Sequence, residues 1–295
     1  MTQTTPSKAV LVTGCSSGIG RASAVYLAQH GYIVFATVRK ETDADSLRGE
    51  RLPTLIPICP LDLTKPDDIS GAIEAVKREL NARQIKGLYA IVNNAGAGGV
   101  APLELLEIDK FRRELETRIL APIALLQGLL PLIRAAHGRV VWIVTPSIIP
   151  IPYVASIHAC DFAVNCIART LQIELQRWHI PNIMIRCGGV KTAASAKSAQ
   201  ELEDDFKNWP AERFALYAED LKKEQAELSE FDEKRTEPVE IAKVVARALD
   251  AQRPRTRYQI GYLAGVAALL EYLPQSWVDS IMARRSLSGK SADRA

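Results

Sequence analysis

The sequence predicts a single α/β domain with a doubly wound parallel sheet, a helical insertion before the penultimate helix and a short C-terminal helical extension. Two observations carry this prediction. Short apolar, β-branched runs alternate with stretches of helical periodicity along the 295 residues, and a glycine-rich turn follows the first run. The composition, 47% apolar and 24% charged, is that of a globular protein with a substantial core. We therefore treat residues 1–295 as one domain.

The expected strands are apolar runs that end at turn-forming residues. In chain order they cover residues 9–14, 32–38, 55–63, 88–96, 138–145, 182–188 and 256–261. The expected helices repeat apolar residues at three- and four-residue spacing, and the first ends at a glycine C-cap, Gly31. They cover residues 21–31, 67–80, 109–135, 153–177 and 238–251. Because strands and helices alternate, each connection is expected to be a crossover, which makes the sheet parallel.

Residues 193–236 interrupt this alternation with a highly charged helical pattern that includes "ELEDDFKNW". The segment follows the sixth expected strand, and open α/β sheets bind ligands at the carboxyl ends of their strands. We expect it to form either a solvated helical surface or a lid over such a site. The tail, residues 262–295, is amphipathic and forms the C-terminal extension.

Charge and cysteine usage exclude several classes of protein. A formal net charge of +3 favours neither nucleic acid nor an anionic membrane as a partner. The five cysteines form no Cys-x-x-Cys pair, which favours reduced thiols over a disulfide framework. The four histidines show no metal-ligand spacing. Neither a signal-peptide layout nor a run of about 18 apolar residues is apparent, so we expect a cytoplasmic protein without a membrane span.

The turn "VTGCSSGIG" at residues 12–20 places Gly14, Gly18 and Gly20 between the first strand and the first helix. Glycines there permit tight backbone angles and let the chain approach a pyrophosphate closely. The helix N-terminus adds free N–H groups and a positive dipole. The turn therefore predicts a dinucleotide cofactor.

With "NNAG" at 93–96 after the fourth strand, this TGxxxGxG spacing resembles the short-chain dehydrogenase/reductase family and its Rossmann-type fold. The resemblance covers residues 8–261, and "RPRTRYQIG" is similar to the branch that handles hydroxysteroids and retinols. "RCGGVKT" at 186–192 resembles the family's nicotinamide loop, with Cys187 at its proline position. The cofactor residues that the resemblance implies are Gly14, Ser16, Ser17, Gly18, Ile19, Gly20, Asp62, Leu63, Asn93, Ala95, Gly96, Gly188, Val190 and Thr192. The chemistry of the side chains adds Arg39, Lys40 and Asp161.

The end of the second strand, "ATVRK", predicts which dinucleotide binds. An acidic residue in place of Val38 would accept a hydrogen bond from the ribose 2′-hydroxyl of NAD(H), and valine cannot. Arg39 follows, and its guanidinium matches the geometry of a 2′-phosphate, with Lys40 as a possible second cation. We therefore expect NADP(H) rather than NAD(H). The alternative is that both cations are simply exposed charges at a strand end.

The resemblance also implies a catalytic tyrosine and, four residues later, a lysine that lowers its pKa. These positions fall on Ile157 and Asp161. The family's serine falls on Thr145, or on Ser147 with a one-residue gap, and its helical asparagine falls on Arg118. Isoleucine has no proton to give, so the usual proton-transfer machinery is absent.

Two replacements are complementary in charge, because the cation has moved to Arg118 and an anion stands at Asp161. We expect these side chains to pair beneath the nicotinamide ribose, with Asp161 accepting a ribose hydroxyl; a packing repair in a site that lost its function is equally compatible. Tyr153 would lie one turn before Ile157 if the helix has already begun, which makes it a candidate proton donor. His158 is rotated away and is expected to pack elsewhere.

Three functions fit these residues: an oxidoreductase with a non-standard proton donor, a non-redox catalyst such as a cyclase or isomerase, and a cofactor-binding pseudoenzyme. We favour an NADP(H)-dependent oxidoreductase whose substrate is a small lipophilic carbonyl or alcohol. The apolar loop "TPSIIPIPY" at 145–153 supports a lipophilic substrate, and Leu103, Leu105, Trp209 and Phe214 are expected to add to its pocket. The resemblance implies a homodimer or homotetramer formed by the helices at 109–135 and 153–177.

Overall fold

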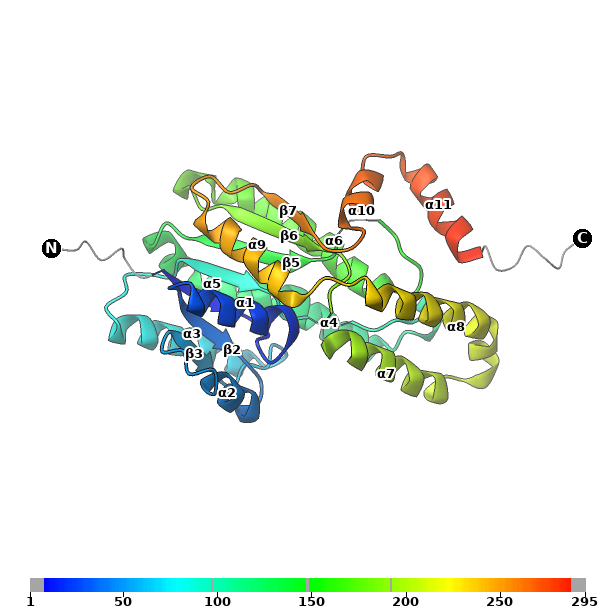
Figure 1. The fold of residues 1–295 in the computed structure, drawn as a ribbon, viewed down its shortest axis with the longest axis horizontal. Coiled ribbons are helices and arrows are strands. Elements are labelled where there is room, and N and C mark those ends of the chain that lie inside the picture. The colour runs from blue at the N-terminus through cyan, green and yellow to red at the C-terminus, as the bar shows by residue number, and fades with distance from the viewer. Residues whose placement is uncertain (1–7, 97, 147–148, 192, 288–295) are drawn as a thin grey trace, which may run out of the picture.

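The computed structural model describes residues 8–96, 98–146, 149–191 and 193–287. Its centre is a seven-stranded sheet in the order β3-β2-β1-β4-β5-β6-β7, and every neighbouring pair is parallel (Figure 1). The strands are β1 (Ala9–Val12), β2 (Ile33–Thr37), β3 (Leu55–Ile58), β4 (Ala90–Asn93), β5 (Arg139–Val144), β6 (Asn182–Cys187) and β7 (Arg257–Ile260). The order reverses beside β1, so β1 and β4 flank the switch point where open sheets bind ligands. The predicted fold class is confirmed.

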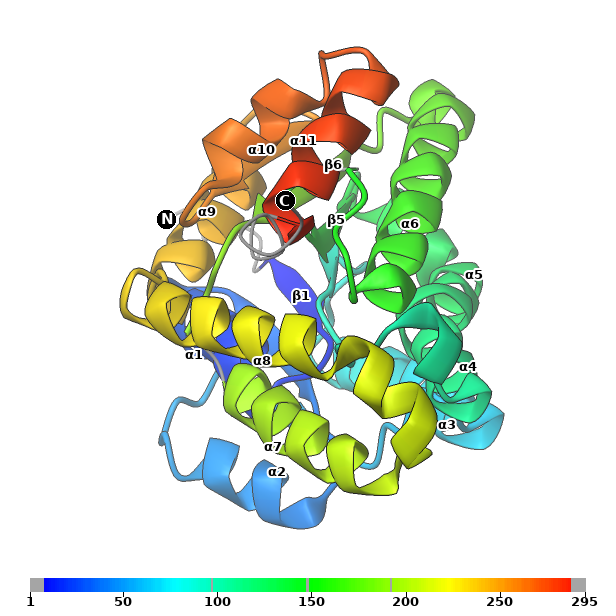
Figure 2. The same cartoon turned by 90° about the vertical axis from the view of Figure 1, so that its right-hand side faces the viewer.

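Helices cover both faces of the sheet, so each central strand is buried on both sides (Figures 1 and 2). One core joins the sheet to α1 (Gly18–Gln29), α2 (Glu41–Arg48) and α9 (Pro238–Asp250). The other joins it to α3 (Pro66–Ala82), α5 (Ala121–Ala135) and α6 (Ala155–Glu174). Pro66 and Pro238 stand in the first turns of α3 and α9, where a missing N–H costs no intrahelical bond. The short helix α2 was not predicted.

The helix expected at 109–135 forms as three segments: α4 (Ile108–Leu115), the π-helix η2 (Glu116–Leu120) and α5. Single π turns inside α-helices occur frequently at functional sites, and this one carries Arg118. The combined segment Ile108–Ala135 is long and apolar enough to cross a membrane by length and composition, because an 18-residue window within it has a mean hydropathy of 1.4. The expectation that no such segment exists is therefore wrong, although α5 buries one side against the sheet.

The charged insertion folds into two long helices, α7 (Ala193–Asn208) and α8 (Ala211–Glu233), beyond the carboxyl ends of the strands (Figure 2). An apolar cluster joins them to the short helix η1 (Leu103–Leu105) and to Tyr153. The buried members of this lid cluster are Ala101, Leu105, Leu202, Trp209 and Leu221. Phe206, Trp209 and Phe214 form its aromatic centre, with ring centroids 5.0–6.0 Å apart. Of the four predicted pocket residues, Leu103 is exposed and the other three belong to this cluster.

Two helices follow the last strand, α10 (Ala264–Leu270) and α11 (Gln275–Leu287). Glu271, just after α10, forms an ion pair with the buried Arg186 of β6, and Arg186 also donates to Asn165 of α6 at 2.9 Å. These contacts fix α10 beside the sheet, whereas α11 lies farther out (Figure 1).

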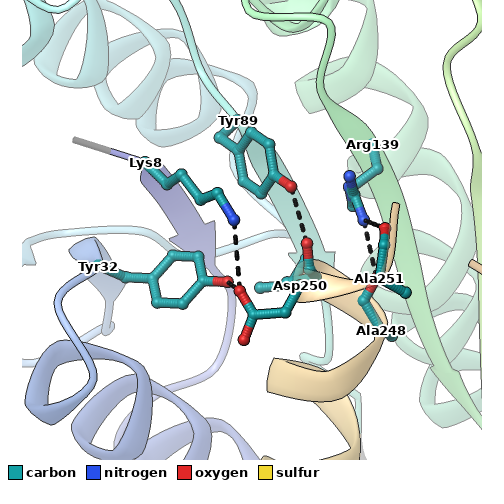
Figure 3. A network of polar contacts seen from close by, with 8 residues as sticks. Lys8, Tyr32, Tyr89, Arg139, Ala248, Asp250 and Ala251 are labelled. Atoms are coloured by element: carbon teal, nitrogen blue, oxygen red, sulfur yellow. Dashed lines mark hydrogen bonds and ion pairs between the residues drawn. The ribbon is translucent and has the colours of Figure 1, made fainter. Parts of the chain in front are cut away.

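Side chains at the amino end of the sheet hold the C-terminus of α9 (Figure 3). Tyr32 donates to Asp250 Oδ1 at 2.5 Å, and Lys8 lies 3.3 Å from the same oxygen. Tyr89 and Arg139 donate to backbone carbonyls at the end of α9, at 2.7–3.0 Å. These bonds satisfy carbonyls that have no partner within the helix. They fix the end of the sheet opposite the switch point.

Candidate active site

The glycine turn after β1 has the geometry of a phosphate cradle. Gly14 and Gly18 have positive φ angles of 72° and 59°, which side chains rarely adopt. A Cβ at Gly20 would lie 2.2 Å from the carbonyl oxygen of Gly14, so the turn closes only with glycine there. Ser16 and Ser17 are exposed beside it. Helix α1 has no acidic residue in its first turn, which leaves the positive end of its dipole to an anion.

Asn94, which the sequence analysis did not single out, fixes the loop after β4 to this turn. Its Nδ2 donates to the carbonyl of Thr13 at 2.8 Å, and the Thr13 hydroxyl accepts the backbone N–H groups of Asn94 and Ala95 at 3.0 Å. Asn93 is buried, yet neither its Oδ1 nor its Nδ2 bonds to any described residue. A buried amide in this state points to a ligand. The cradle and this amide fit a nicotinamide dinucleotide.

The residues expected to bind the adenosine half of the cofactor lie in the loops after β2 and β3. Val38 is buried, and Arg39 and Lys40 are exposed. Burial acts to raise the pKa of Asp62, but hydrogen bonds from Thr64 and the charge of Arg39 lower it below its usual value. Arg39 and Asp62 thus belong to one electrostatic site. Leu63, next to Asp62 in the chain, is buried.

The loop after β6 lies between β7 and the insertion. A Cβ at Gly188 would lie 2.1 Å from the carbonyl oxygen of Tyr262. The backbone just after β7 therefore leaves no room for a side chain at this position. Val190 pairs with Thr236, which ends the insertion. Burial raises the pKa of the Cys187 thiol to about 12, so it is an apolar packing residue. Thr192, like Ser147, lies outside the described residues.

Arg118 and Asp161 form an ion pair, as the charge exchange in the sequence predicted. Their side chains are only 14% and 4% exposed. The second carboxylate oxygen of Asp161 accepts the backbone N–H of Thr145 at 2.9 Å, so η2, α6 and the end of β5 meet at one carboxylate. A Cβ at Gly96 would lie 2.8 Å from Arg118 Nη1, which places the guanidinium against the "NNAG" loop. Arg118 Nε is buried without a partner among the described residues.

Tyr153 does not stand on the helix that carries Ile157. Helix α6 begins at Ala155, and Tyr153 has a left-handed backbone with φ 65°. The alignment of the two residues one helical turn apart is therefore wrong, because the chain turns sharply before the helix begins. The Tyr153 side chain packs against the lid cluster. His158 is bonded through Nδ1 to the carbonyl of Ile149 at 2.8 Å and holds the loop, which agrees with the expected packing role.

Glu114 is the residue that the sequence analysis missed. It lies on α4, one turn before Arg118, and is only 7% exposed. Its Oε1 accepts the backbone N–H of Gly99 at 3.1 Å, while Oε2 is buried without a partner among the described residues. The sequence offered one signal for it: residues four apart share a helix face, which predicts that Glu114 lies on the same side of the helix as Arg118. The spacing alone did not show that Glu114 is buried.

Comparison with known proteins agrees with this architecture. The family model for short chain dehydrogenase matches residues 8–203. Human 11-beta-hydroxysteroid dehydrogenase type 2 is 32% identical over 280 residues, which cover 91% of this chain and 68% of that protein. Human retinol dehydrogenase 16 is 32% identical over 287 residues, 93% of this chain and 87% of the relative. The chain belongs to the short-chain dehydrogenase family.

Solved structures show the same fold at lower identity. A short-chain dehydrogenase from Streptomyces avermitilis superposes with a TM-score of 0.74 at 22% identity, over 99% of this chain and all (100%) of the other. L-Sorbose reductase from Gluconobacter frateurii, solved with NADPH and L-sorbose, gives 0.69 at 22% identity, over 88% and 97% of the two chains.

Proposed function

We propose that this protein is an NADP(H)-dependent oxidoreductase that acts on an apolar carbonyl or alcohol through a non-standard site. The observation that carries the proposal is the intact dinucleotide cradle, Gly14, Gly18 and Gly20 with the unpartnered amide of Asn93, directly beside the buried pair of Arg118 and Asp161. A bound nicotinamide would supply or accept a hydride at this edge of the sheet. Membership in a family of oxidoreductases supports redox chemistry.

The residues of the protein would bind the cofactor and orient the substrate. Arg39, with Lys40, would bind the 2′-phosphate, and Asp62 with Leu63 would hold the adenine. Asp161 would accept a ribose hydroxyl while it holds Arg118 and the Thr145 backbone in place. The guanidinium of Arg118, with its buried Nε–H, would polarise a substrate oxygen. Lipophilic alcohols such as hydroxysteroids and retinol are the substrate class, by analogy with the named relatives.

The first experiment is a fluorescence titration of the full chain with NADPH and NADH. We expect NADPH to bind more tightly, and Arg39→Ala to weaken NADPH alone by about 10- to 100-fold, the loss of a charge-assisted contact of about 1.5–3 kcal/mol. Lys86→Ala is the matched control, because Lys86 is exposed at the opposite end of the sheet. Equal affinity for both nucleotides would overturn the NADP(H) assignment, and no binding of either would overturn the proposed function.

A second candidate is a protein that binds the nucleotide without turning over a substrate. Each carboxylate oxygen of Asp161 already has a partner within the protein, and Ile157 supplies no proton. Nucleotide binding without reduction of any ketosteroid or retinal would favour this candidate, or a non-redox catalyst, over the oxidoreductase.

We further propose that the protein forms a homodimer or homotetramer. Large apolar side chains are exposed along the helices expected at the interface: Ile108, Leu120, Phe162 and Ile173. Light scattering after size exclusion tests this, and a monomer would contradict it.

A further inference from the structure

The carboxyl group of Glu114 lies beside the position where the family's tyrosine is missing. A Cβ built at Gly98 would lie 2.1 Å from Ile157 Cγ1 and 3.1 Å from Glu114 Oε2. The isoleucine side chain and the carboxyl oxygen therefore both pack against Gly98, in the loop after β4. The residue that lost the phenol hydroxyl and a buried acid are thus neighbours.

Two buried polar atoms at this place have no partner among the described residues: Glu114 Oε2 and Arg118 Nε. Both residues lie on the same helical segment, one turn apart, and Arg118 also contacts the "NNAG" loop. A buried oxygen without a hydrogen bond costs free energy, so it is retained where a ligand or a reaction uses it. A protonated carboxyl group offers an O–H donor, and a guanidinium Nε offers an N–H donor.

The surroundings of Glu114 favour its protonated form. Burial raises the pKa of this carboxyl above its usual value, against the effects of the nearby Ser156 hydroxyl, the hydrogen bond from the Gly99 backbone and the charge of Arg118. The charge of Asp161 raises the pKa further. Cys160, on α6, also faces the group, and its own pKa is raised to about 11, first by burial. The surroundings of Glu114 thus shift this buried carboxyl group toward its protonated form.

We propose that Glu114 is the proton-transfer residue of this site and takes over the task of the missing tyrosine. The inference rests on the proposed oxidoreductase function. In the reducing direction, a bound reduced nicotinamide would supply a hydride to the carbonyl carbon, and the electron pair of the C=O π bond would move to oxygen. That oxygen forms a bond to the proton of Glu114 as the carboxyl O–H bond breaks. The carboxylate left behind regains a proton from water, and alcohol oxidation reverses each step.

Glu114, Arg118 and Asp161 then have different roles in the site. Arg118 is held by Asp161, so its charge stabilises the negative oxygen and the carboxylate that forms, but it cannot release a proton at neutral pH. Both carboxylate oxygens of Asp161 already accept hydrogen bonds, one from Arg118 and one from the Thr145 backbone, so Asp161 is a positioning residue here. Glu114 therefore transfers the proton, and Arg118 stabilises the negative charge.

The test uses the full chain with Glu114→Gln, which keeps an acceptor for the Gly99 N–H and removes the titrating group. The first readout is the infrared C=O stretch of a protonated carboxylic acid, followed across the neutral pH range. We expect this band in the wild type and its loss in Glu114→Gln. Glu116→Gln is the matched control, because Glu116 is exposed on the same helical segment and its loss should leave the band unchanged.

The second readout is reduction of 3-, 11- and 17-ketosteroids and of retinal with NADPH. Glu114→Gln should lower kcat by about 100-fold or more, the usual contribution of a general acid, with NADPH affinity unchanged. Glu114→Asp, which keeps an acid but retracts it, should retain part of the activity and serves if the glutamine variant does not fold.

The outcomes distinguish the two proposals. Unchanged kcat in Glu114→Gln, or a protonated-carboxyl band that is absent or that survives the substitution, would overturn the role of Glu114 while leaving the oxidoreductase standing. A wild-type protein that binds NADPH but reduces none of these probes would overturn the proposed function, and the Glu114 proposal would fail with it.

Discussion

Arg118 of η2 and Asp161 of α6 form an ion pair between two elements that lie far apart in the sequence, and both side chains are largely buried. Each residue makes the other tolerable, because a buried charge beside its counter-charge costs less than a buried charge alone. Removing one partner leaves an uncompensated buried charge, which is more costly than removing both.

We expect Asp161→Asn to lower the free energy of unfolding by about 3–5 kcal/mol, because Arg118 then lacks a counter-charge. The double variant Arg118→Met/Asp161→Leu should lose less than the sum of the losses in Arg118→Met alone and Asp161→Leu alone. Chemical denaturation of the wild type, these two single variants and the double variant measures this coupling. Additive losses would show that the two side chains do not interact in solution.

The glycine turn gives a prediction with an internal control. Gly20→Ala places a Cβ 2.2 Å from the carbonyl oxygen of Gly14, a backbone atom that cannot move away cheaply. We expect a loss of about 1–3 kcal/mol in unfolding free energy, as for overpacking, and loss of NADPH binding. Gly71→Ala in α3 meets nothing within 4 Å and should stabilise the protein by about 0.5–1 kcal/mol. Equal behaviour of the two variants would contradict the crowded turn.

Glu114 predicts a particular dependence of stability on pH. Its pKa is raised in the folded state, so its favourable contribution is complete below the unfolded value of about 4.3 and is lost as pH rises through the folded value. Glu114→Gln should therefore gain stability relative to the wild type as pH increases over that interval. Denaturant melts at several pH values measure the difference, with Glu116→Gln following the wild type. A pH-independent difference would mean that the pKa of Glu114 is not raised.

The lid cluster predicts a local effect. Trp209 is 8% exposed and packs against Phe206 and Phe214, so Trp209→Ala should weaken the docking of α7 and α8 by about 3–5 kcal/mol. Limited proteolysis should then cut within these helices before the sheet unfolds. Trp277→Ala, at a side chain 62% exposed on α11, should change little, within about 0.5 kcal/mol. Equal protease resistance of both variants would show that the cluster does not hold the lid.

The sequence by itself determined the sheet and the glycine turn, whereas the altered catalytic positions remain a prediction from the resemblance. These features are local: a run such as "AVLV" is apolar because both faces of a central parallel strand are covered, and Gly14, Gly18 and Gly20 follow it at a fixed spacing. The opposite charges of Arg118 and Asp161 were also readable, since a buried charge requires a counter-charge. Helix starts were less certain: α6 begins two residues later than predicted, because Tyr153 takes a left-handed turn.

Only the tertiary structure decided which polar groups share the site. Glu114 looked like one more charged residue on a helix, and its burial depends on a loop after β4, whose Gly99 bonds to it, and on α6, whose Ile157 borders it. Those contacts join residues distant in sequence, which no local pattern encodes. The same holds for Asn94 and Thr13, which join two loops, and for the aromatic residues of the insertion. The spacing of residues within one segment predicts the secondary structure of that segment. The burial and pairing of a polar side chain depend on which segments pack together in the folded protein.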